Sequence, residues 1–590
     1  MCFWHKSDIL REKVIEKING FLIGRLTMAR TVAIGIQRFN EVIENNYFYI
    51  DKTGFIKEWW ESGDSVTLIT RPRRFGKTLT ISMLEQFFSI EYAGRSDLFQ
   101  GLSVWHDKKF QELQGTYPVI SLSFANVKEK DFNATKQRIG QLITDLYSKN
   151  RFLLETDLLS DEEKHFFRSV TMDMPEVIAT ISLYKMSDFL HRYYNKNVII
   201  LLDEYDTPMQ EAYVNGFWED LVYYIRSLFN STFKTNPWLE RGVMTGITRV
   251  SKESIFSDLN NLKVVTTTSD EYGFCFGFTE EEVYNAMDEF GLTNKNEVKM
   301  WYDGFIFGNH RDIYNPWSIL NFLDTKQLKP YWANTSSNSL VGKLIREGNS
   351  DIKQTMEELI AGKSTTIQLD EQIVYNQLDD NETAIWSLLL ASGYLRVKEL
   401  RIGRNEYGEW EQTYELELTN FEVKLMFEKL IQGWFMSSRG NYNGFIKALL
   451  ADDTESMNAY MNELTLAVFS YFDTGKQLGK REDPERFYHG FVLGLMVELR
   501  GRYLITSNRE SGFGRYDVML EPTQPQDDAI IIEFKVFNQK KEATLEDTLA
   551  NAHEQLEKRK YETVLIEKGI CENRIHKYGF AFKGKEVLIG

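Results

Sequence analysis

A short segment near the start of the chain has the residue types that bind a nucleotide phosphate. Arg71-Pro-Arg-Arg-Phe-Gly-Lys-Thr78 lies between an apolar run typical of a strand, residues 65–70, and a helical pattern, residues 78–88. In such a loop the backbone N–H groups surround the phosphates, a lysine neutralises their charge and a threonine hydroxyl ligates Mg²⁺. We therefore predict a P-loop that binds ATP. The residues assigned to nucleotide binding are Arg73, Arg74, Phe75, Gly76, Lys77 and Thr78, and Thr78 is also assigned to the metal.

The loop departs from the usual phosphate-binding pattern in one place. Arg71 stands where a P-loop normally begins with glycine. The sequence therefore does not determine the exact geometry of the loop, although its Gly-Lys-Thr core is intact. For Arg73 and Arg74, pairing with acidic residues at the surface is an alternative of about equal weight.

Two acidic residues follow a second apolar run. Residues 197–202 are predicted to form a strand that is apolar on both faces, as a central strand of a parallel sheet requires, and Asp203-Glu204 follow it. An aspartate at this place holds Mg²⁺ and the adjacent glutamate activates the attacking water. We assign Asp203 to the nucleotide and metal, and Glu204 to catalysis. A plain strand-end turn is the alternative, but the order of the two motifs favours an ATPase site.

A further strand is predicted over residues 241–248, and polar residues lie at its end. Thr245, Thr248 and Arg249 fall where NTPases place groups that sense the γ-phosphate. We assign Arg249 to catalysis as a group that stabilises transferred charge. A capped strand end is an alternative of nearly equal weight.

Near the other end of the chain, two acids and a lysine have the pattern of a metal-dependent phosphodiesterase. Glu533 and Lys535 are two residues apart on a predicted strand, residues 529–536, hence on one face, and a predicted hairpin brings Asp517 beside them. Two carboxylates on adjacent strands bind Mg²⁺, and the lysine positions the attacking water. We assign Asp517 and Glu533 to the metal and all three residues to catalysis. The alternative is a solvated ion-pair cluster on an edge hairpin.

Composition limits the classes of protein that carry these motifs. The chain has 590 residues, 43% hydrophobic and 26% charged, which predicts several globular domains. Three distant cysteines and eight histidines without metal-ligand spacing argue against a disulfide framework and a zinc site. The net charge of −17 argues against a whole-surface nucleic-acid binder and requires a local basic groove for such a partner. No run approaches ~18 apolar residues, so we predict no membrane contact and a cytoplasmic protein.

Strands alternate with longer helical segments, so the predicted fold class is α/β. Thr279 and Glu282 predict a capping box at a helix start, and residues 394–418 predict a hairpin. The expected segments are a leader over 1–29 with Met28 as an alternative start, a three-layer P-loop domain with a parallel sheet over 30–278, a helical lid or winged-helix-like subdomain over 279–345, a mostly helical connecting region over 346–483 and a small α/β domain over 484–590.

Several motifs taken together resemble a known family. They are Tyr47-Phe-Tyr-Ile-Asp-Lys-Thr53, Arg71-Pro-Arg-Arg-Phe-Gly-Lys-Thr78, Leu202-Asp-Glu-Tyr-Asp206, Asn260-Asn-Leu262, Trp301-Tyr-Asp-Gly-Phe305 and Tyr314-Asn-Pro316. In order and spacing they are similar to the bacterial and archaeal AAA-ATPase-like family over residues 30–345. The resemblance implies that Asp51-Lys52-Thr53 lies near the nucleotide. We interpret residues 301–305 as an aromatic core with a glycine turn.

Members of this family commonly carry a C-terminal domain of the PD-(D/E)XK nuclease superfamily. The region from residue 484 is similar to the core of that superfamily, with its two acids and lysine in place. The resemblance implies that Gln555 is a further catalytic residue and that Glu498 or His489 adds a metal ligand. It also implies a nucleic-acid partner at the C-terminal domain.

Two functions are consistent with these observations. The first is an ATPase, with ATP and Mg²⁺ as cofactors, that regulates an Mg²⁺-dependent nuclease-like domain acting on DNA or RNA. The second is a nucleotide-dependent switch or scaffold whose C-terminal domain binds a partner without cleavage. The acidic charge and the helical middle region favour the second function. A helicase or motor is disfavoured because no motor motif beyond Arg249 is found. A homo-oligomer is left open, and no protein partner is identified.

Overall fold

The computed structural model describes residues 29–590 apart from short segments, so the predicted leader up to residue 28 lies outside the described residues. The segments that are not described are 250–254, 257–258, 334–340, 343, 346–349, 370–381, 405–407, 437–440, 469–491, 493–494, 497–498, 500, 508–509, 512–513, 516 and 539–540. The chain divides into two compact units, Met1–Trp332 and Ala333–Gly590.

The first unit contains a parallel five-stranded sheet with the order β2-β3-β4-β1-β5. Its strands are β1 (Val66–Thr70), β2 (Val119–Ser123), β3 (Val198–Asp203), β4 (Leu239–Gly246) and β5 (Leu262–Val265). Every residue of β1 and β3 is buried, as apolar strands in the middle of a covered sheet require. The carboxyl ends of parallel strands meet at one edge. The loop after β1 and the acids after β3 therefore share this edge, with the end of β4 between them.

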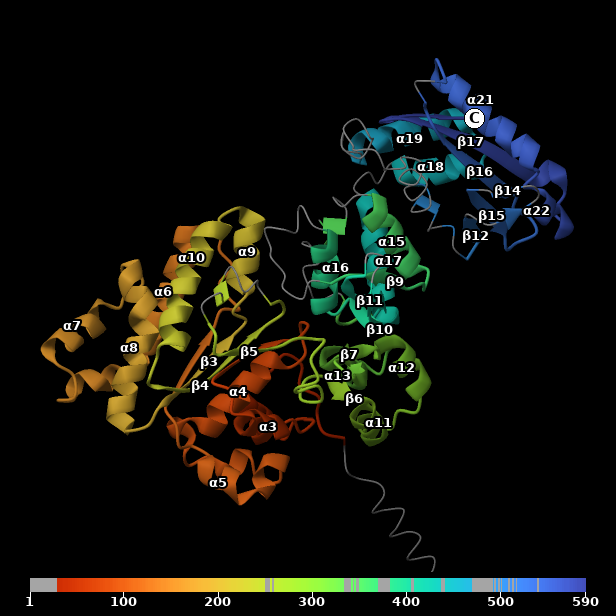
Figure 1. Ribbon diagram of the computed structural model, residues 1–590. Helices are drawn as coiled ribbons and strands as arrows, with labels where there is room; N and C mark the ends of the chain where they lie inside the picture. The colour runs from red at the N-terminus through yellow and green to blue at the C-terminus, as the bar shows by residue number, and fades with distance from the viewer. Residues whose placement is uncertain are drawn as a thin grey trace, which may run out of the picture. The chain divides into compact units, whose positions relative to one another are not determined.

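Helices cover both faces of this sheet (Figure 1). The connection from β1 to β2 runs toward one edge and that from β2 to β3 returns, so right-handed crossovers place α4 on one face and α6, α8 and α10 on the other. The helices are α2 (Phe39–Glu44), α3 (Gly54–Ser62), α4 (Lys77–Phe88), α5 (Lys108–Leu113), α6 (Phe132–Lys149), α7 (Asp161–Ser169), α8 (Glu176–Tyr194), α9 (Thr207–Asn215) and α10 (Trp218–Phe229). The predicted three-layer α/β fold is confirmed.

A small subdomain completes the first unit. It comprises β6 (Phe278–Thr279), α11 (Glu280–Glu289), α12 (Lys295–Tyr302), β7 (Phe305–Phe307), β8 (His310–Tyr314) and α13 (Pro316–Thr325), with the sheet order β6-β8-β7. The predicted capping box of Thr279 and Glu282 starts α11. Tyr302 and Phe305 are buried and Gly304 has a φ of 121°, so the aromatic core and glycine turn that the sequence indicated are present.

The second unit begins with a helical region that contains one small sheet. Its elements are α15 (Ser350–Ile360), β9 (Thr365–Ile367), α16 (Glu382–Ala391), β10 (Leu395–Arg404), β11 (Trp410–Leu418) and α17 (Phe421–Met436), and the sheet order is β10-β11-β9. The predicted hairpin is the antiparallel pair β10 and β11. Among the described residues, this region has the order helix, strand, helix, hairpin and helix, which agrees with the predicted mostly helical segment.

The end of the chain forms a five-stranded mixed sheet with the order β12-β15-β16-β17-β18 (Figure 1). Its strands are β12 (Tyr503–Ser507), β15 (Val518–Pro522), β16 (Ala529–Val536), β17 (Ile575–Lys583) and β18 (Glu586–Ile589), with a small hairpin of β13 (Glu510–Ser511) and β14 (Gly514–Arg515). The pair β16 and β17 is parallel and is connected through α21 (Leu545–Arg559) and α22 (Thr563–Glu567). The predicted small α/β domain is therefore present.

The two faces of this sheet pack against different helices. Ile530, Ile532 and Phe534 share a core with α18 (Asn441–Leu450) and α19 (Thr454–Val468), whereas Ala529 and Ile531 share one with the end of α21 and with α22. Since successive side chains alternate between faces, Glu533 and Lys535 lie on the α21 face.

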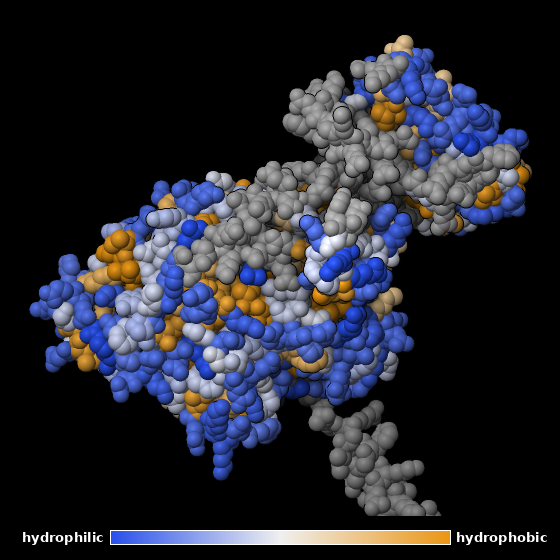
Figure 2. All heavy atoms as spheres, in the orientation of Figure 1, coloured by the Kyte–Doolittle hydropathy of each residue, from blue (hydrophilic) through white to orange (hydrophobic). Residues whose placement is uncertain are grey.

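Charged and polar side chains occupy most of the surface of the first unit that is visible in Figure 2. Among the described residues, no helix is long and apolar enough to cross a membrane.

Candidate nucleotide and metal sites

The P-loop connects β1 to α4 through a turn with left-handed backbone. Gly76 has a φ of 81°, which glycine adopts freely, and Arg74 has a φ of 66°, which is strained for a residue with a side chain. The helix begins at Lys77, so the amides of its first turn point toward the mouth of the loop. Amides at a helix N-terminus attract anions. The backbone therefore has the arrangement expected of a phosphate site.

The side chain of Lys77 is folded against the loop. Its Nζ donates to the carbonyl oxygens of Arg71 at 2.9 Å and Pro72 at 2.8 Å, and the residue is only 5% exposed. Burial lowers the pKa of Lys77, and the nearby carboxylates of Glu204 and Asp203 oppose this shift. The ammonium group thus lies near the predicted catalytic acid Glu204 and the predicted metal ligand Asp203.

Arg71, which replaces the usual first glycine, directs its side chain away from the loop. Its Nη1 donates to the carbonyl oxygens of Thr70 at 3.0 Å and Thr266 at 2.7 Å, and its Nη2 donates to that of Glu271 at 3.1 Å. The guanidinium also lies 4.4 Å from the ring centroid of Phe307, and burial lowers the pKa of Arg71 to about 10. The arginine is therefore a core residue behind the loop.

The neighbouring loop residues contact protein groups. Arg73 Nη2 donates to Gln210 Oε1 at 3.2 Å. The Arg74 guanidinium lies 4.4 Å from the Trp317 ring. Phe75 is 1% exposed and packs against Phe305 and Phe307, with centroid distances of 4.8 and 5.5 Å. Within the protein, Arg73 thus contacts an amide and Arg74 an indole, and their assignment to the nucleotide stays a prediction.

The predicted metal ligands Thr78 and Asp203 are in direct contact. Thr78 Oγ1 donates to Asp203 Oδ2 at 2.8 Å, and Thr245 Oγ1 donates to Asp203 Oδ1 at 2.5 Å. Burial raises the pKa of Asp203, and these two hydrogen bonds act in the opposite direction. A hydroxyl and a carboxylate oxygen side by side are a donor set that suits Mg²⁺. The structure therefore brings together two residues that are 125 positions apart in sequence.

Glu204 is held in an uncommon backbone conformation. Its φ is 52°, its N–H donates to Thr245 Oγ1 at 3.3 Å, and its Oε2 accepts from Thr207 Oγ1 at 3.1 Å. A left-handed conformation in a residue with a side chain is costly and is found preferentially at functional sites. Thr245, at the end of β4, therefore contacts both acids.

The turn after β4 carries the remaining predicted residues. Thr248 is buried and Arg249 is half-buried. Asp206, to which sequence analysis gave no role, accepts hydrogen bonds from the backbone N–H groups of Ile247 and Thr248, each at 2.9 Å. The sequence signal for Asp206 is its place at the end of the motif Leu202-Asp-Glu-Tyr-Asp206.

The segment Asp51-Lys52-Thr53 is held by several side-chain hydrogen bonds. Asp51 Oδ1 accepts from Thr53 Oγ1 at 2.6 Å, and Asp51 Oδ2 accepts from the N–H of Ser103 at 2.6 Å. Lys52 Nζ lies 2.7 Å from both carboxylate oxygens of Glu282. These contacts fix the segment to α11 and to the turn at Ser103.

The C-terminal acids and lysine lie at the ends of paired strands. Val518 of β15 pairs with Ile532 of β16, and the next residues along the ladder are Asp517 and Glu533. Asp517 Oδ2 accepts from the N–H of Phe534 at 2.8 Å, and Lys535 Nζ lies 3.2 Å from Glu533 Oε1. Glu533 is 1% exposed. A buried carboxylate is unlike the solvated ion-pair cluster that was the alternative interpretation.

Two residues after the core strands complete this site. Gln555 of α21 donates from Nε2 to Glu533 Oε1 and, at 3.1 Å, to the hydroxyl of Tyr561. Tyr561 is 1% exposed, and its pKa is raised by burial and by the charges of Glu533 and Asp517. Sequence analysis missed Tyr561; its spacing of six residues from Gln555 was the available signal. The predicted alternatives Glu498 and His489 lie outside the described residues.

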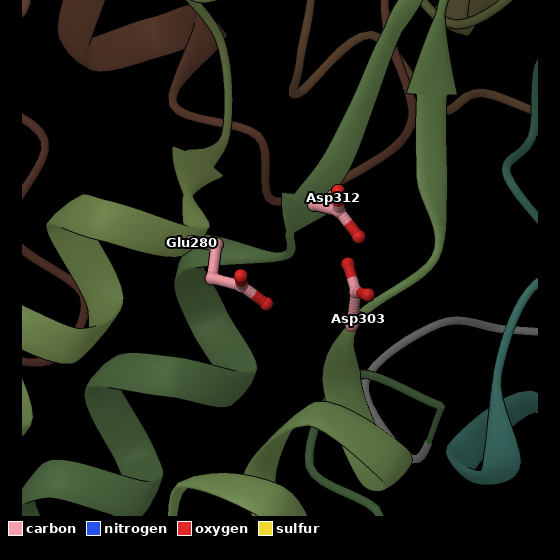
Figure 3. A group of neighbouring side chains, drawn as sticks. All are labelled: Glu280, Asp303 and Asp312. Carbon is pink, nitrogen blue, oxygen red and sulfur yellow. The ribbon is translucent and has the colours of Figure 1, made fainter.

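A third group of acids lies in the small subdomain. The carboxylates of Glu280, Asp303 and Asp312 point toward one another (Figure 3). Lys299 Nζ pairs with Glu280, lies 3.1 Å from Asp312 and lies 3.7 Å from Asp303. The lysine supplies positive charge to the cluster, which is therefore an ion-pair network.

Comparison with known proteins gives one family match in the N-terminal part of the chain and another at its C-terminal end. Residues 33–256 match the model of the AAA-ATPase-like family, described as predicted AAA-ATPases, and residues 483–590 match that of the PD-(D/E)XK nuclease superfamily. An uncharacterized protein in the vnfD 5′ region of Azotobacter chroococcum mcd 1 is 27% identical over 399 residues, which are 67% of this chain and 68% of the relative. The chain contains a domain of the AAA-ATPase-like family followed by a domain of the PD-(D/E)XK nuclease superfamily.

Proposed function

We propose that the first unit binds and hydrolyses ATP and thereby regulates Mg²⁺-dependent cleavage of DNA or RNA by the C-terminal domain. The contact between Thr78 and Asp203, 2.8 Å long and adjacent to Lys77 at the start of α4, is the observation that carries the nucleotide-binding part. It joins the two motifs that a P-loop ATPase requires.

Each residue of the nucleotide site has a role in this proposal. Lys77 leaves the carbonyl oxygens of Arg71 and Pro72 and moves to the phosphates when the nucleotide binds. Thr78 and Asp203 would hold Mg²⁺, which would supply charge neutralisation to the phosphates. Glu204, oriented by Thr207, accepts a proton from the attacking water.

The C-terminal residues provide the second site. Asp517 and Glu533 would hold Mg²⁺, which polarises the phosphodiester and lowers the pKa of bound water. Lys535, on the same face as Glu533, orients the water. Gln555 fixes the orientation of the Glu533 carboxylate through its hydrogen bond to Oε1. The proposal includes a cytoplasmic location and a nucleic-acid partner at this site. It does not decide whether the protein forms a homo-oligomer.

The test compares the wild type with Lys77→Ala and Lys535→Ala in the presence of ATP, Mg²⁺ and mixed DNA and RNA. We expect Lys77→Ala to abolish ATP hydrolysis and Lys535→Ala to abolish cleavage while ATP binding persists. The control variants are Lys109→Ala and Lys568→Ala, which remove exposed ion-paired lysines from each unit. Absence of any cleavage by the wild type would contradict the nuclease part of the proposal.

The alternative function is a nucleotide-dependent switch or scaffold that binds a partner without cutting it. The net charge of −17 favours it, because such a charge repels nucleic acid outside a local basic groove. ATP-dependent capture of a partner that persists in Asp517→Ala and Glu533→Ala, without cleavage by the wild type, would support this function.

A further inference from the structure

The carboxylate of Asp206 organises the turn that leads to Arg249. Asp206 is 1% exposed, and its Oδ2 accepts from the N–H of Ile247, the N–H of Thr248 and the hydroxyl of Thr248, each at 2.9 Å. The hydroxyl of the adjacent Tyr205 donates to the carbonyl oxygen of Thr248 at 2.8 Å. The residue before Arg249 is therefore fixed to the segment that follows the metal-binding strand.

The same carboxylate oxygen is connected to the P-loop. Gln210, one helical turn further along α9, donates from Nε2 to Asp206 Oδ2 at 3.4 Å. The amide oxygen of Gln210 accepts from Arg73 Nη2 at 3.2 Å. A continuous chain of hydrogen bonds therefore runs from Arg73 through Gln210 and Asp206 to Thr248.

The second oxygen of Asp206 fixes the position of this chain. Oδ1 is buried without a hydrogen-bond partner among the described residues, and a Cβ atom built on Gly246 would lie 2.8 Å from it. The N–H of Arg71 donates to the carbonyl oxygen of the same Gly246 at 3.1 Å. The carboxylate is therefore packed tightly between α9 and the end of β4, and it has little room to move independently of either.

We propose that Asp206 and Gln210 are positioning residues that set the place of Arg249 according to the state of Arg73. This inference rests on the proposed ATPase function. When phosphate draws the Arg73 guanidinium from Gln210, the amide of Gln210 is released to strengthen its long hydrogen bond to Asp206. The turn at residues 247–249 is then held more firmly when the nucleotide is present, which is when Arg249 must meet the γ-phosphate.

The test measures ATP hydrolysis by the full chain with Gln210→Ala and Asp206→Asn. We expect Gln210→Ala to lower kcat about tenfold while KM for ATP changes less than about twofold, because an arginine that acts on transferred charge contributes mainly in the transition state. The matched control is Gln141→Ala, which removes another glutamine paired with an aspartate four residues away on a helix, here on the surface. Gln210 is only half-buried, so its variant keeps the test valid if Asp206→Asn fails to fold.

A double-mutant cycle with Arg249→Ala separates positioning from a general structural effect. If Gln210 acts through Arg249, the double variant loses no more activity than Arg249→Ala alone. Additive losses, or a Gln210→Ala variant with unchanged kcat, would overturn the inference. A wild type that binds ATP without hydrolysing it would instead contradict the proposed ATPase function, so the two failures are distinguishable.

Discussion

At the scale of single residues, Arg71 has the position of a loop glycine and the environment of a core residue. Its guanidinium donates hydrogen bonds to the carbonyl oxygens of Thr70, Thr266 and Glu271 and packs on Phe307. The sequence identified this position as unusual but could not determine the direction of the side chain. That direction depends on a segment almost 200 positions away, in which Thr266 is 195 residues from Arg71.

Arg71→Ala therefore tests stability in the first place. Removing the side chain takes a hydrogen-bond donor from the carbonyl oxygens of Thr70, Thr266 and Glu271 and creates a cavity, so we expect a loss of about 2–4 kcal/mol in the free energy of unfolding. Denaturant unfolding followed by intrinsic fluorescence measures the change. Arg38→Ala is the control, because the Arg38 side chain is 63% exposed. A loss as small as that of the control would show that the buried contacts of Arg71 contribute little.

The site residues that could be predicted are those that belong to recognisable motifs of adjacent residues. Lys77, Thr78 and Asp203 follow apolar strands in recognisable motifs, and the structure places them together. Asp206 and Tyr561 could not be predicted in the same way. Their roles depend on hydrogen bonds to residues brought near by the fold, and the types Asp and Tyr are common in turns and cores.

At the scale of elements, the bounds of strands buried on both faces could be predicted closely from the sequence. The order of these strands in the sheet could not. The predicted bounds of β16, residues 529–536, agree with the structure, and those of β3 differ by one residue at each end. The order β2-β3-β4-β1-β5 depends on crossovers that no local pattern encodes. This order puts the end of β4 between the two motifs, which explains why Thr245 contacts Asp203.

The acid cluster of the small subdomain predicts a pH dependence of stability. Burial, with the charge of Asp312, raises the pKa of Asp303 to about 7. An acid whose pKa is raised on folding contributes stability that is present below its unfolded pKa of about 4 and is lost as the pH rises through about 7. The side chain of Asp303→Asn cannot ionise, so the variant does not lose this contribution at high pH. We expect the melting temperature of the variant minus that of the wild type to be about 2–4 °C larger at pH 8 than at pH 5.

Thermal unfolding of both proteins at the two pH values measures this difference. Asp324→Asn, at an exposed position of α13, is the control for a change of net charge. If Asp303→Asn and the wild type lose stability in parallel between pH 5 and pH 8, the burial of this carboxyl does not affect folding.

Helix α19 protects the edge strand of the C-terminal sheet. Asn462 accepts from the N–H of Val587 at 2.9 Å and donates to its carbonyl oxygen at 2.7 Å, and Asn458 does the same for Ile589 at 2.8 and 2.7 Å. Thr465, one turn further, donates to the carbonyl oxygen of Lys585. Side chains on one helical face thus satisfy the backbone groups of β18 that would otherwise be available to another strand.

Asn462→Leu should therefore destabilise the second unit and expose the edge of β18. We expect a loss of about 1–3 kcal/mol, because the N–H and carbonyl oxygen of Val587 lose their partners. Self-association at high concentration should also increase. Chemical unfolding and light scattering measure the two effects, with Asn551→Leu, an exposed position on α21, as the control. Equal behaviour of the two variants would contradict a protective role for α19.

At the scale of the whole molecule, the sequence indicated two chemical sites in separate domains. The structure gives two compact units that meet in sequence at Trp332 and Ala333. The predicted boundary near residue 278 falls within the first unit. Residues beyond it contact the P-loop: Asn315 Nδ2 and Trp332 Nε1 both donate to the carbonyl oxygen of Arg73, at 3.4 and 3.0 Å. The sequence pattern after residue 278 did not reveal that Asn315 and Trp332 form hydrogen bonds with the loop.

Trp332, the last residue of the first unit, contacts the nucleotide-binding loop, and the proposed regulation of the second unit by ATP would pass through this residue. Separating the chain after Trp332 should break this route. We expect a 30–332 fragment to bind ATP with the affinity of the full chain, since all the nucleotide-site residues lie within it. We expect a 333–590 fragment to cleave nucleic acid at a rate that ATP does not change. In the full chain, cleavage should respond to ATP, and Lys77→Ala should remove the response.

ATP titrations of cleavage by the three proteins measure this, with Lys109→Ala as the control. A 333–590 fragment that responds to ATP would place regulation within the second unit, because this fragment lacks the P-loop.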